Sequence, residues 1–404
     1  MNGKQSTRSK RVGATGSRAT ATAAPTRRPR RSGRGPHRPV GRRSGTFVVL
    51  LVAVVALNLI GLVMVLSASS VTALNTTGSS WYHFQRQGMW FIVALVAMLI
   101  TLRIDYRLWR RVSAPLLVVA LGLLVAVLVP GLGSAANGSQ RWIVFGPISV
   151  QPSEIAKLAV VVFIGDLLAR RSHRIRDTTL SLRPVLVVLV VVAALVLKQP
   201  NLGTTLVIGM VAFTMMFIAG VPLAPLSAWA SVATGGAVLL AMSADYRRDR
   251  VLAFLDPWDD PLNTGYQTIQ SLVGIASGGL WGVGLGNGRA KWGFLPFAHT
   301  DFIFAVVAEE LGFIGALTLI GLFVLLGLVG IRIAAEAPDR FGTLVATGIT
   351  CWLVVQAFVN MGAVVGVLPI TGVPLPFLSA GGSALVVNMT AVGVMLNIAR
   401  QGRR

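Results

Sequence analysis

Long apolar runs separated by short polar segments dominate this sequence. Most of the runs extend for roughly 18–25 residues, which is enough helix to cross a hydrocarbon core of about 30 Å. Because a bilayer core offers the backbone no hydrogen-bond partners, each crossing segment must form a helix. The pattern therefore predicts an all-α polytopic membrane protein of about ten transmembrane helices, at 46–67, 88–104, 113–131, 153–170, 184–198, 202–220, 224–243, 301–333, 342–366 and 376–398.

The stretch between the seventh and eighth runs does not follow this pattern. Residues 266–285 are apolar but short and rich in glycine, which favours a re-entrant or interfacial helix within a long outer loop. Gly282, Gly284, Gly286 and Gly288 alternate at the end of this stretch and just beyond it. A phosphate-binding loop would need a strand before it and a helix after it, so we predict that these glycines serve close backbone packing instead.

The distribution of charge identifies a basic segment at the N-terminal end of the sequence. The chain is 54% hydrophobic, which excludes an ordinary soluble protein, yet its formal net charge is +22. Residues 1–45 hold 13 of the 36 Lys and Arg residues, no acidic residue and no apolar periodicity. We interpret this segment as a disordered basic cytoplasmic tail that contacts anionic lipid headgroups rather than nucleic acid. The first apolar run is too long for a cleavable signal peptide.

The same charges orient the helices. Lys and Arg concentrate in alternate loops, and the positive-inside rule places those loops and both termini in the cytoplasm. The chain then divides into the tail 1–45, a membrane domain at 46–400 and a cytoplasmic C-terminus at 401–404. Cys351 is the single cysteine, so no internal disulfide or cysteine-based metal site is expected.

The strongest candidate for chemistry is the acid that precedes the eighth run. The window KWGFLPFAHTDFIFAVVAEELG (291–312) holds three acidic residues, Asp301, Glu309 and Glu310. An acid where a loop meets an apolar helix is costly to keep unless it has a use. We predict that Asp301 is the reactive carboxylate, and that Glu309 and Glu310 cap or pair with neighbouring segments.

Other polar residues are expected on the same outer side. Glu154 and Lys157 share one helix face, where they either neutralise each other or face a substrate, and both roles stay open. Lys198 lies in a tight turn, KQPNLGTTL (198–206), and a plain connector does not explain it. The last outer loop (360–383) ends in Gly-Gly-Ser, which either presents backbone N–H groups to an anion or starts the tenth helix with Ser379 as its cap.

Four stretches together resemble one family. They are RWIVFGPISVQPSEIAK (141–157), KQPNLGTTL, YQTIQSLVGIASGGLWGVGLG (266–286) with LPFAHTDFIFAVVAEELG (295–312), and NMGAVVGVLPITGVPLPFLSAGGS (360–383). In these motifs the chain resembles the SEDS proteins (shape, elongation, division and sporulation), the FtsW/RodA group. The resemblance covers about residues 46–400 and leaves only the tail outside.

The resemblance implies a ten-helix peptidoglycan glycosyltransferase that polymerises lipid II at the outer face of the cytoplasmic membrane. It also implies a class B penicillin-binding protein (an FtsI-type transpeptidase) and other divisome proteins as partners. The family's catalytic aspartate falls on Asp301, and its buried acid and lysine fall on Glu154 and Lys157. The expected substrate-binding residues are Arg141, Gln151, Glu154, Lys157, Lys198, Lys291, His299 and Ser379.

Three positions depart from the usual family pattern. Asn201 stands where an aspartate is common, Phe297 where an acid is frequent, and Ala380 where an aromatic residue is usual. A charged role at residue 201 is therefore in doubt. The assignment of Asp301 is unaffected.

The implied reaction suits these residue types. The acceptor 4-hydroxyl must lose its proton as it attacks, and one positioned carboxylate that accepts it contributes typically 10²–10⁴ in rate. The departing pyrophosphate needs positive charge, from Lys or Arg or from a divalent cation such as Mg²⁺ or Mn²⁺. Asp301 is expected to be the general base, with a metal-ligand role as the alternative.

Two functions of other classes fit the same features. A lipid II flippase would also need broken helices and buried charges, although transport sites lie near the bilayer midplane. A non-catalytic division scaffold would tolerate the loss of Asp301. Within the family, the basic tail and the SASSV stretch (67–71) resemble the division branch, which acts at the septum, and the elongation branch is the alternative.

Overall fold

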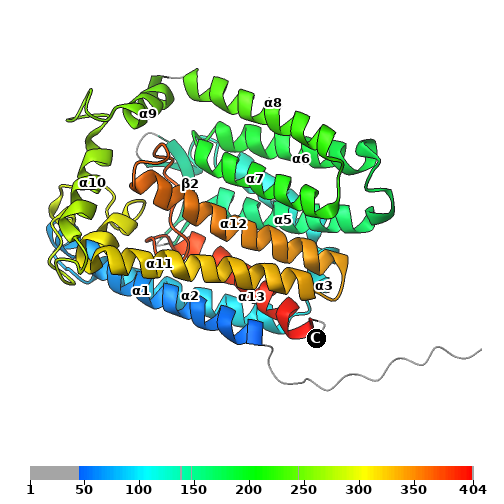
Figure 1. Cartoon of the computed structure of the whole chain (residues 1–404), viewed down its shortest axis with the longest axis horizontal. Coiled ribbons are helices and arrows are strands. Elements are labelled where there is room, and N and C mark those ends of the chain that lie inside the picture. Colours follow the sequence, from blue (N-terminus) through cyan, green and yellow to red (C-terminus); the bar gives the residue numbers. More distant parts are fainter. Residues whose placement is uncertain (1–44, 137–138, 147, 244, 403–404) are drawn as a thin grey trace, which may run out of the picture. The chain divides into compact units, whose positions relative to one another are not determined.

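The protein is a bundle of long helices. The computed structural model describes residues 45–136, 139–146, 148–243 and 245–402, so the tail predicted at 1–45 lies almost wholly outside the described residues. The long helices lie side by side with their axes along one direction (Figure 1). They are α1 (Gly45–Thr77), α2 (Tyr82–Arg103), α4 (Ser113–Ala126), α5 (Pro152–Arg170), α6 (Thr178–Leu197), α7 (Leu202–Ala219), α8 (Leu223–Met242), α11 (Ile303–Glu336), α12 (Arg340–Val364) and α13 (Gly382–Gln401).

These helices match the ten predicted runs and confirm a polytopic helical membrane protein. Among the described residues, eight helices are long and apolar enough to cross a membrane. The other two are α4, which is only 14 residues long, and α5. Charged residues interrupt the apolar surface of α5, and three of them, Glu154, Lys157 and Asp166, are buried. Packing against α4, α7 and α12 covers α5, so its charges avoid the lipid.

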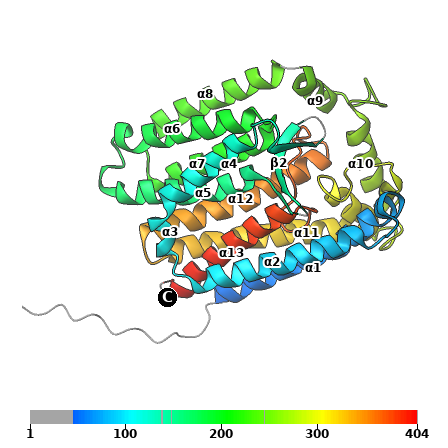
Figure 2. The ribbon, with the colours of Figure 1, turned by 180° about the vertical axis from the view of Figure 1, so that it is seen from behind.

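Burial differs sharply between the helices. In the membrane-spanning stretch of α13, 78% of the residues are buried inside the protein. In the corresponding stretch of α8 the share is 6%. α13 packs along α2, and α12 contacts α5, α7 and α11 (Figures 1 and 2). The centre of the bundle is therefore α5, α12 and α13, and α8 presents most of its apolar surface outward.

A small sheet was missed by the all-helical prediction. The strands β1 (Gly133–Ala136), β2 (Ser139–Phe145) and β3 (Ile148–Val150) pair antiparallel in the order β1-β2-β3. Ile143 faces Val150 in the register of the second pair, and Gly146 at φ +58° begins the turn between them. Glycine and serine at the start of this segment are typical of irregular structure. The β-branched and aromatic residues of RWIVF were the signal that favoured a strand.

The remaining elements are short. They are α3 (Arg107–Arg111), η1 (Ser172–Arg174), α9 (Asp245–Leu255), α10 (Tyr266–Gly278) and η2 (Ala290–Trp292). α10 corresponds to the predicted extra helix of the long outer loop and packs against α11.

The glycine-rich segment after α10 pairs with a break in α11. Gly312 interrupts that helix at φ +69°, ψ −168°. Across the break, the N–H of Val283 donates to the carbonyl of Glu309 (3.0 Å) and that of Phe313 to the carbonyl of Gly279 (2.9 Å). A Cβ at Gly282 would lie 2.2 Å from the carbonyl oxygen of Glu310. Close backbone packing, the role predicted for this glycine, is confirmed.

The two glutamates before this break hold the loop in place. Glu309 accepts hydrogen bonds from the backbone N–H of Arg289 (2.6 Å) and of Ala290 (3.2 Å). Glu310 accepts from the hydroxyl of Ser67 (2.6 Å) and from the N–H of Gly286 (3.1 Å). Their predicted structural role is confirmed.

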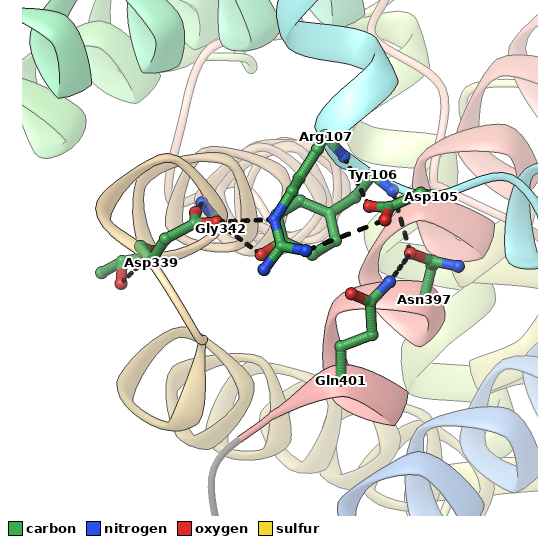
Figure 3. A network of polar contacts seen from close by, with 8 residues as sticks. Asp105, Tyr106, Arg107, Asp339, Gly342, Asn397 and Gln401 are labelled. Carbon is green, nitrogen blue, oxygen red and sulfur yellow. Dashed lines mark hydrogen bonds and ion pairs between the residues drawn. The ribbon is translucent and has the colours of Figure 1, made fainter. Parts of the chain in front are cut away.

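A polar network ties three segments together at the other end of α11 (Figure 3). The hydroxyl of Tyr106 donates to Asp339 (2.7 Å), and Nε of Arg107 lies 3.2 Å from the same carboxylate. Asp339 also caps α12 by accepting from the N–H of Gly342 (2.8 Å). The N–H of Tyr106 donates to Asn397 of α13 (2.9 Å).

Candidate functional site

Asp301 lies in the turn immediately before α11. Asn360 of α12 fixes this turn, because its side-chain amide donates to the backbone carbonyl of Asp301 (2.7 Å) and to that of Val373 (2.8 Å). One amide thus joins α12, the Asp301 turn and the last outer loop. A small hollow at this junction is lined by residues that include Asp301, Asn360 and Gly372.

The last outer loop is clamped to the same turn. The hydroxyl of Ser379 donates to the carbonyl of Thr300 (2.6 Å) and accepts from the N–H of Leu375 (2.8 Å). The N–H of Ala380 donates to the carbonyl of His299 (3.0 Å). The Ser379 hydroxyl therefore forms its hydrogen bonds within the protein, once as donor and once as acceptor. Its alternative role as a helix cap is wrong, because α13 starts at Gly382 with Gly381 as its N-cap.

An arginine faces the Asp301 carboxylate from the small sheet. A Cβ at Gly372 would lie 3.6 Å from Oδ2 of Asp301 and 3.9 Å from Nη1 of Arg141, so both groups border one spot. Arg141 is held by the turn after α6, where its Nε donates to the carbonyl of Gln199 (2.9 Å) and its Nη2 to that of Pro200. The predicted outer cation Arg141 and the predicted acid are brought together.

A second arginine, Arg250 of α9, acts on the same acid. Its Nη1 donates to the carbonyl of Ile370 in the last outer loop (3.3 Å). Burial raises the pKa of Asp301 to about 6, although the charges of Arg250 and Arg141 act to lower it. Asp301 therefore changes protonation close to neutral pH, where a general base is most effective.

The buried pair in α5 supports the site from inside the bundle. Nζ of Lys157 lies 2.9 Å from Glu154 and donates to Oε1 of Gln356 (2.5 Å). Nε2 of Gln356 donates to the carbonyl of Pro374 in the last outer loop (2.8 Å). The side chains of Glu154 and Lys157 are 1% and 3% exposed. Their predicted mutual neutralisation is confirmed, and a substrate role for them stays a prediction.

The other predicted substrate residues lie in different surroundings. Gln151 is buried, and its N–H donates to the hydroxyl of Ser383 (3.2 Å). Lys198 is exposed at the end of α6. Lys291 is buried, with Nζ donating to the carbonyl of Gly286 and lying 3.9 Å from Glu310. The described contacts do not bring Lys198 or Lys291 to Asp301, so substrate binding by either lysine stays a prediction.

His299 lines a second hollow on the other side of the turn. This pocket of about 150 Å³ is bordered by α2, β2, β3 and the start of α13. The imidazole rings of His83 and His299 lie 5.0 Å apart. Burial, followed by the nearby His83, lowers the pKa of His299 to about 4, so that its ring is neutral at pH 7.

Sequence reasoning missed several residues that build the site. Arg250 lies in a run of mixed charges, a pattern typical of a solvated surface, whereas its guanidinium reaches the last outer loop. Asn360 and Gln356 lie on an apolar helix. A polar side chain in such a helix itself indicates a structural or functional role. His83 and Arg86 lie just before a predicted crossing and carried no motif.

The donor set around Asp301 does not suit a resident metal ion. The described residues contain no group of three or more His, Cys, Asp or Glu side chains able to hold one. Asp301 instead lies under the influence of two guanidinium groups. Most of the oxygen atoms that coordinate a divalent cation here would have to come from a bound substrate.

Comparisons with known proteins agree with this architecture. A family model described as "Cell cycle protein", which groups FtsW, RodA and SpoVE, matches residues 48–404. A "Probable peptidoglycan glycosyltransferase FtsW" of Geobacter metallireducens is 44% identical over 351 residues, covering 87% of this chain and 94% of the relative. Stage V sporulation protein E of Bacillus subtilis is 41% identical over 362 residues, covering 90% and 99%.

Solved structures show the same fold. A chain from a study titled "Structural coordination of polymerization and crosslinking by a peptidoglycan synthase complex" is 31% identical with a TM-score of 0.71, covering 87% of this chain and 97% of that one. The rod shape determining protein RodA of Thermus thermophilus is 28% identical with a TM-score of 0.65, covering 88% and 97%. The resemblance carried by the four motifs is confirmed, and the chain belongs to the FtsW/RodA/SpoVE family of cell cycle proteins.

Proposed function

We propose that this protein is a peptidoglycan glycosyltransferase that polymerises lipid II into glycan strands and releases undecaprenyl pyrophosphate. The names of its relatives support the activity. The observation that carries the mechanism is the Asp301 carboxylate, with a pKa near neutrality, beside the guanidinium of Arg141.

The proposed reaction is a single displacement at the sugar carbon that bears the pyrophosphate. The acceptor 4-hydroxyl gives its proton to Asp301 as its oxygen bonds to that carbon, and the bond from the carbon to the pyrophosphate oxygen breaks. Negative charge then builds on the departing pyrophosphate. Arg141 and Arg250 approach this region from β2 and α9 and supply fixed positive charge to stabilise it.

The position of Asp301 favours an enzyme over a transporter. It lies in a turn before α11, at one end of the bundle, whereas transport sites typically lie near the middle of the spans. The buried charges that would suit a transporter, Glu154 and Lys157, pair with each other and with Gln356.

The cellular role belongs to the same proposal. Relatives named FtsW support a division enzyme at the septum, and an elongation role like that of RodA is the alternative. The similar solved chain comes from a complex that couples polymerisation to crosslinking, which supports an FtsI-type class B penicillin-binding protein as partner, beside other divisome proteins. Both termini are proposed to be cytoplasmic, which places Asp301 at the outer face.

Dependence on Mg²⁺ or Mn²⁺ is also part of the proposal. The ion would be carried by the oxygens of the substrate pyrophosphate and would neutralise charge on the leaving group. Glycan synthesis should then stop on chelation and resume when either ion is returned. Activity that survives chelation would remove the ion from the proposal.

The first test is polymerisation of lipid II by the purified chain with its cognate transpeptidase. Wild type should form glycan strands, whereas Asp301→Ala and Asp301→Asn should lose activity by roughly 10²-fold or more, the contribution of a general base. Asp259→Asn is the matched control, because Asp259 is an exposed acid of the same outer segment. Strands from both Asp301 variants would assign the chemistry to another group, and an inactive wild-type complex would favour a flippase or a scaffold.

A further inference from the structure

The pocket beside His299 has a wall of polar residues on one helix face. His83, Arg86, Gln87 and Trp90 of α2 all line it. Their spacing of three, four and seven residues places them on the same side of the helix. Proposed catalysis at Asp301 uses none of these four residues.

The opposite wall is the beginning of α13. Ala380, Gly381 and Gly382 line the pocket there, and no side chain of a described residue caps this 20-residue helix. The first N–H groups of a helix lack partners within it and carry the positive end of its dipole, which attracts anions. A Cβ at Gly382 would lie 2.3 Å from the indole of Trp90, so only glycine lets the helix start this close to α2.

Gln87 provides an independent indication of a ligand. The residue is 5% exposed and lines the pocket, and no hydrogen bond joins its side chain to another described residue. Its amide atoms are not among the fully enclosed polar atoms of the described residues, so they open onto the pocket. A ligand in the pocket can therefore form hydrogen bonds with this amide.

The charge of the pocket is positive. Arg86 is the one fully charged side chain among the described residues that line it, and no acid is among them. Within the described part of the chain, Arg86 makes one long polar contact, from Nη2 to the hydroxyl of Ser149 at 3.4 Å. The neutral ring of His299 can donate or accept a hydrogen bond without adding charge.

We propose that this pocket binds an oxyanion, a phosphate of the pyrophosphate carried by the second of two lipid-linked substrates. The proposal rests on the proposed polymerisation, in which two such pyrophosphates meet and only one of them leaves. The turn that contains His299, Thr300 and Asp301 separates this pocket from the small hollow lined by Asp301 and Gly372. An oxyanion held in the pocket would therefore bring the second substrate to the Asp301 turn.

The test measures binding of inorganic pyrophosphate by calorimetry, using the full chain in phosphatidylcholine nanodiscs. Arg86→Gln and Gln87→Leu should each weaken one binding step by about tenfold or more, the size expected for a hydrogen bond to a charged group. Arg248→Gln, which changes an exposed arginine of α9, should bind as wild type does. Asp301→Asn should keep the Arg86-dependent step, and thermal unfolding should show that every variant is folded.

Several results would overturn the proposal. These are no pyrophosphate binding by the wild type, or equal binding by wild type and the Arg86 and Gln87 variants. In nanodiscs that contain phosphatidylglycerol, loss of the Arg86-dependent step would assign the pocket to a lipid headgroup instead. If the step persists in a protein that makes no glycan, the polymerase proposal fails and the oxyanion site stands. If glycan is made without the step, the oxyanion site fails and the polymerase proposal stands.

Discussion

Asp301 is subject to two effects of opposite sign. Burial raises its pKa to about 6, while Arg250 and Arg141 favour the ionised form. A protonated carboxyl cannot accept the proton of the acceptor hydroxyl, so in the proposed mechanism only the form present above this pKa acts as the base. The two arginines therefore keep a buried carboxylate usable near neutral pH.

Glycan synthesis should accordingly be lost as the pH falls through about 6. In Arg250→Gln the midpoint should move to higher pH, because the charge that favours the carboxylate is gone. Initial rates measured across this range give the midpoint independently of any fall in maximal rate. Equal midpoints in the variant and the wild type would assign the titration to another group.

Gly372 borders the point where acid and arginine meet. Its φ is +68°, and an added Cβ would contact both Asp301 and Arg141. Gly372→Ala should therefore strain the loop by about 1 kcal/mol and slow polymerisation by roughly tenfold to hundredfold through misplacement. Gly209→Ala is the matched control, because nothing lies within 4 Å of a Cβ there and its rate should be unchanged. A normal rate for Gly372→Ala would show that this spot is not occupied during the reaction.

At the scale of elements, α5 and α12 support the last outer loop through one chain of contacts. Lys157 donates a hydrogen bond to Gln356. Gln356 in turn donates one to the backbone carbonyl of Pro374, two residues after Gly372. Trp352 also donates to Gln356 (2.7 Å), which leaves the amide little freedom to turn. The buried charges thus act on the site through the backbone of the loop.

Lys157→Met should leave Glu154 buried and unpaired, at a cost of about 3–5 kcal/mol. The double variant Glu154→Gln with Lys157→Met removes both charges and should recover much of that loss. Thermal unfolding in detergent compares the three proteins directly. A double variant no more stable than Lys157→Met would contradict the view that charge pairing dominates at this position.

At the scale of the whole molecule, the two ends of the bundle are built differently. The end with Asp301 is assembled from loops, whereas the end with Asp339 is a network of side chains on helix termini (Figure 3). Burial alone would raise the pKa of Asp339, but the N–H of Gly342, the hydroxyl of Tyr106 and Arg107 together hold it below the ordinary value.

A carboxylate with a lowered pKa stabilises the fold above its ordinary pKa, and this contribution is lost as the pH falls through the lowered value. Stability should therefore decline in acid less steeply for Asp339→Ala than for wild type. At pH 7 the same variant should lose about 1–2 kcal/mol, mostly from the missing helix cap, since the partly exposed ion pair adds little. Asp249→Ala, at an exposed acid of α9, is the control, and an equal loss there would contradict a role for the network.

Much of this architecture could be predicted from the sequence because the bilayer leaves few choices. The length of the apolar runs, and the need of a backbone in the bilayer to form its own hydrogen bonds, were enough to locate the long helices. The free-energy cost of an acidic side chain at the start of an apolar helix was enough to select Asp301 as the candidate. The small sheet was missed because glycine and serine obscured the short strand RWIVF. Arg250 and Arg86 could not be placed, because their partners depend on how loops fold over the bundle end. The position of Lys291 could not be predicted for the same reason: its charge turns inward to Glu310, and its substrate role stays a prediction.

The origin of the site in distant parts of the chain has a consequence for biosynthesis. Asp301 precedes Asn360, which fixes its turn, by 59 residues, and the clamp by Ser379 lies later still. A nascent chain therefore inserts eight of its long helices before the groups that shape the Asp301 turn have left the ribosome. We expect a half-translated protein to remain inactive in the membrane. Activity should begin only after the segments that contain Asn360 and Ser379 have been synthesised and packed.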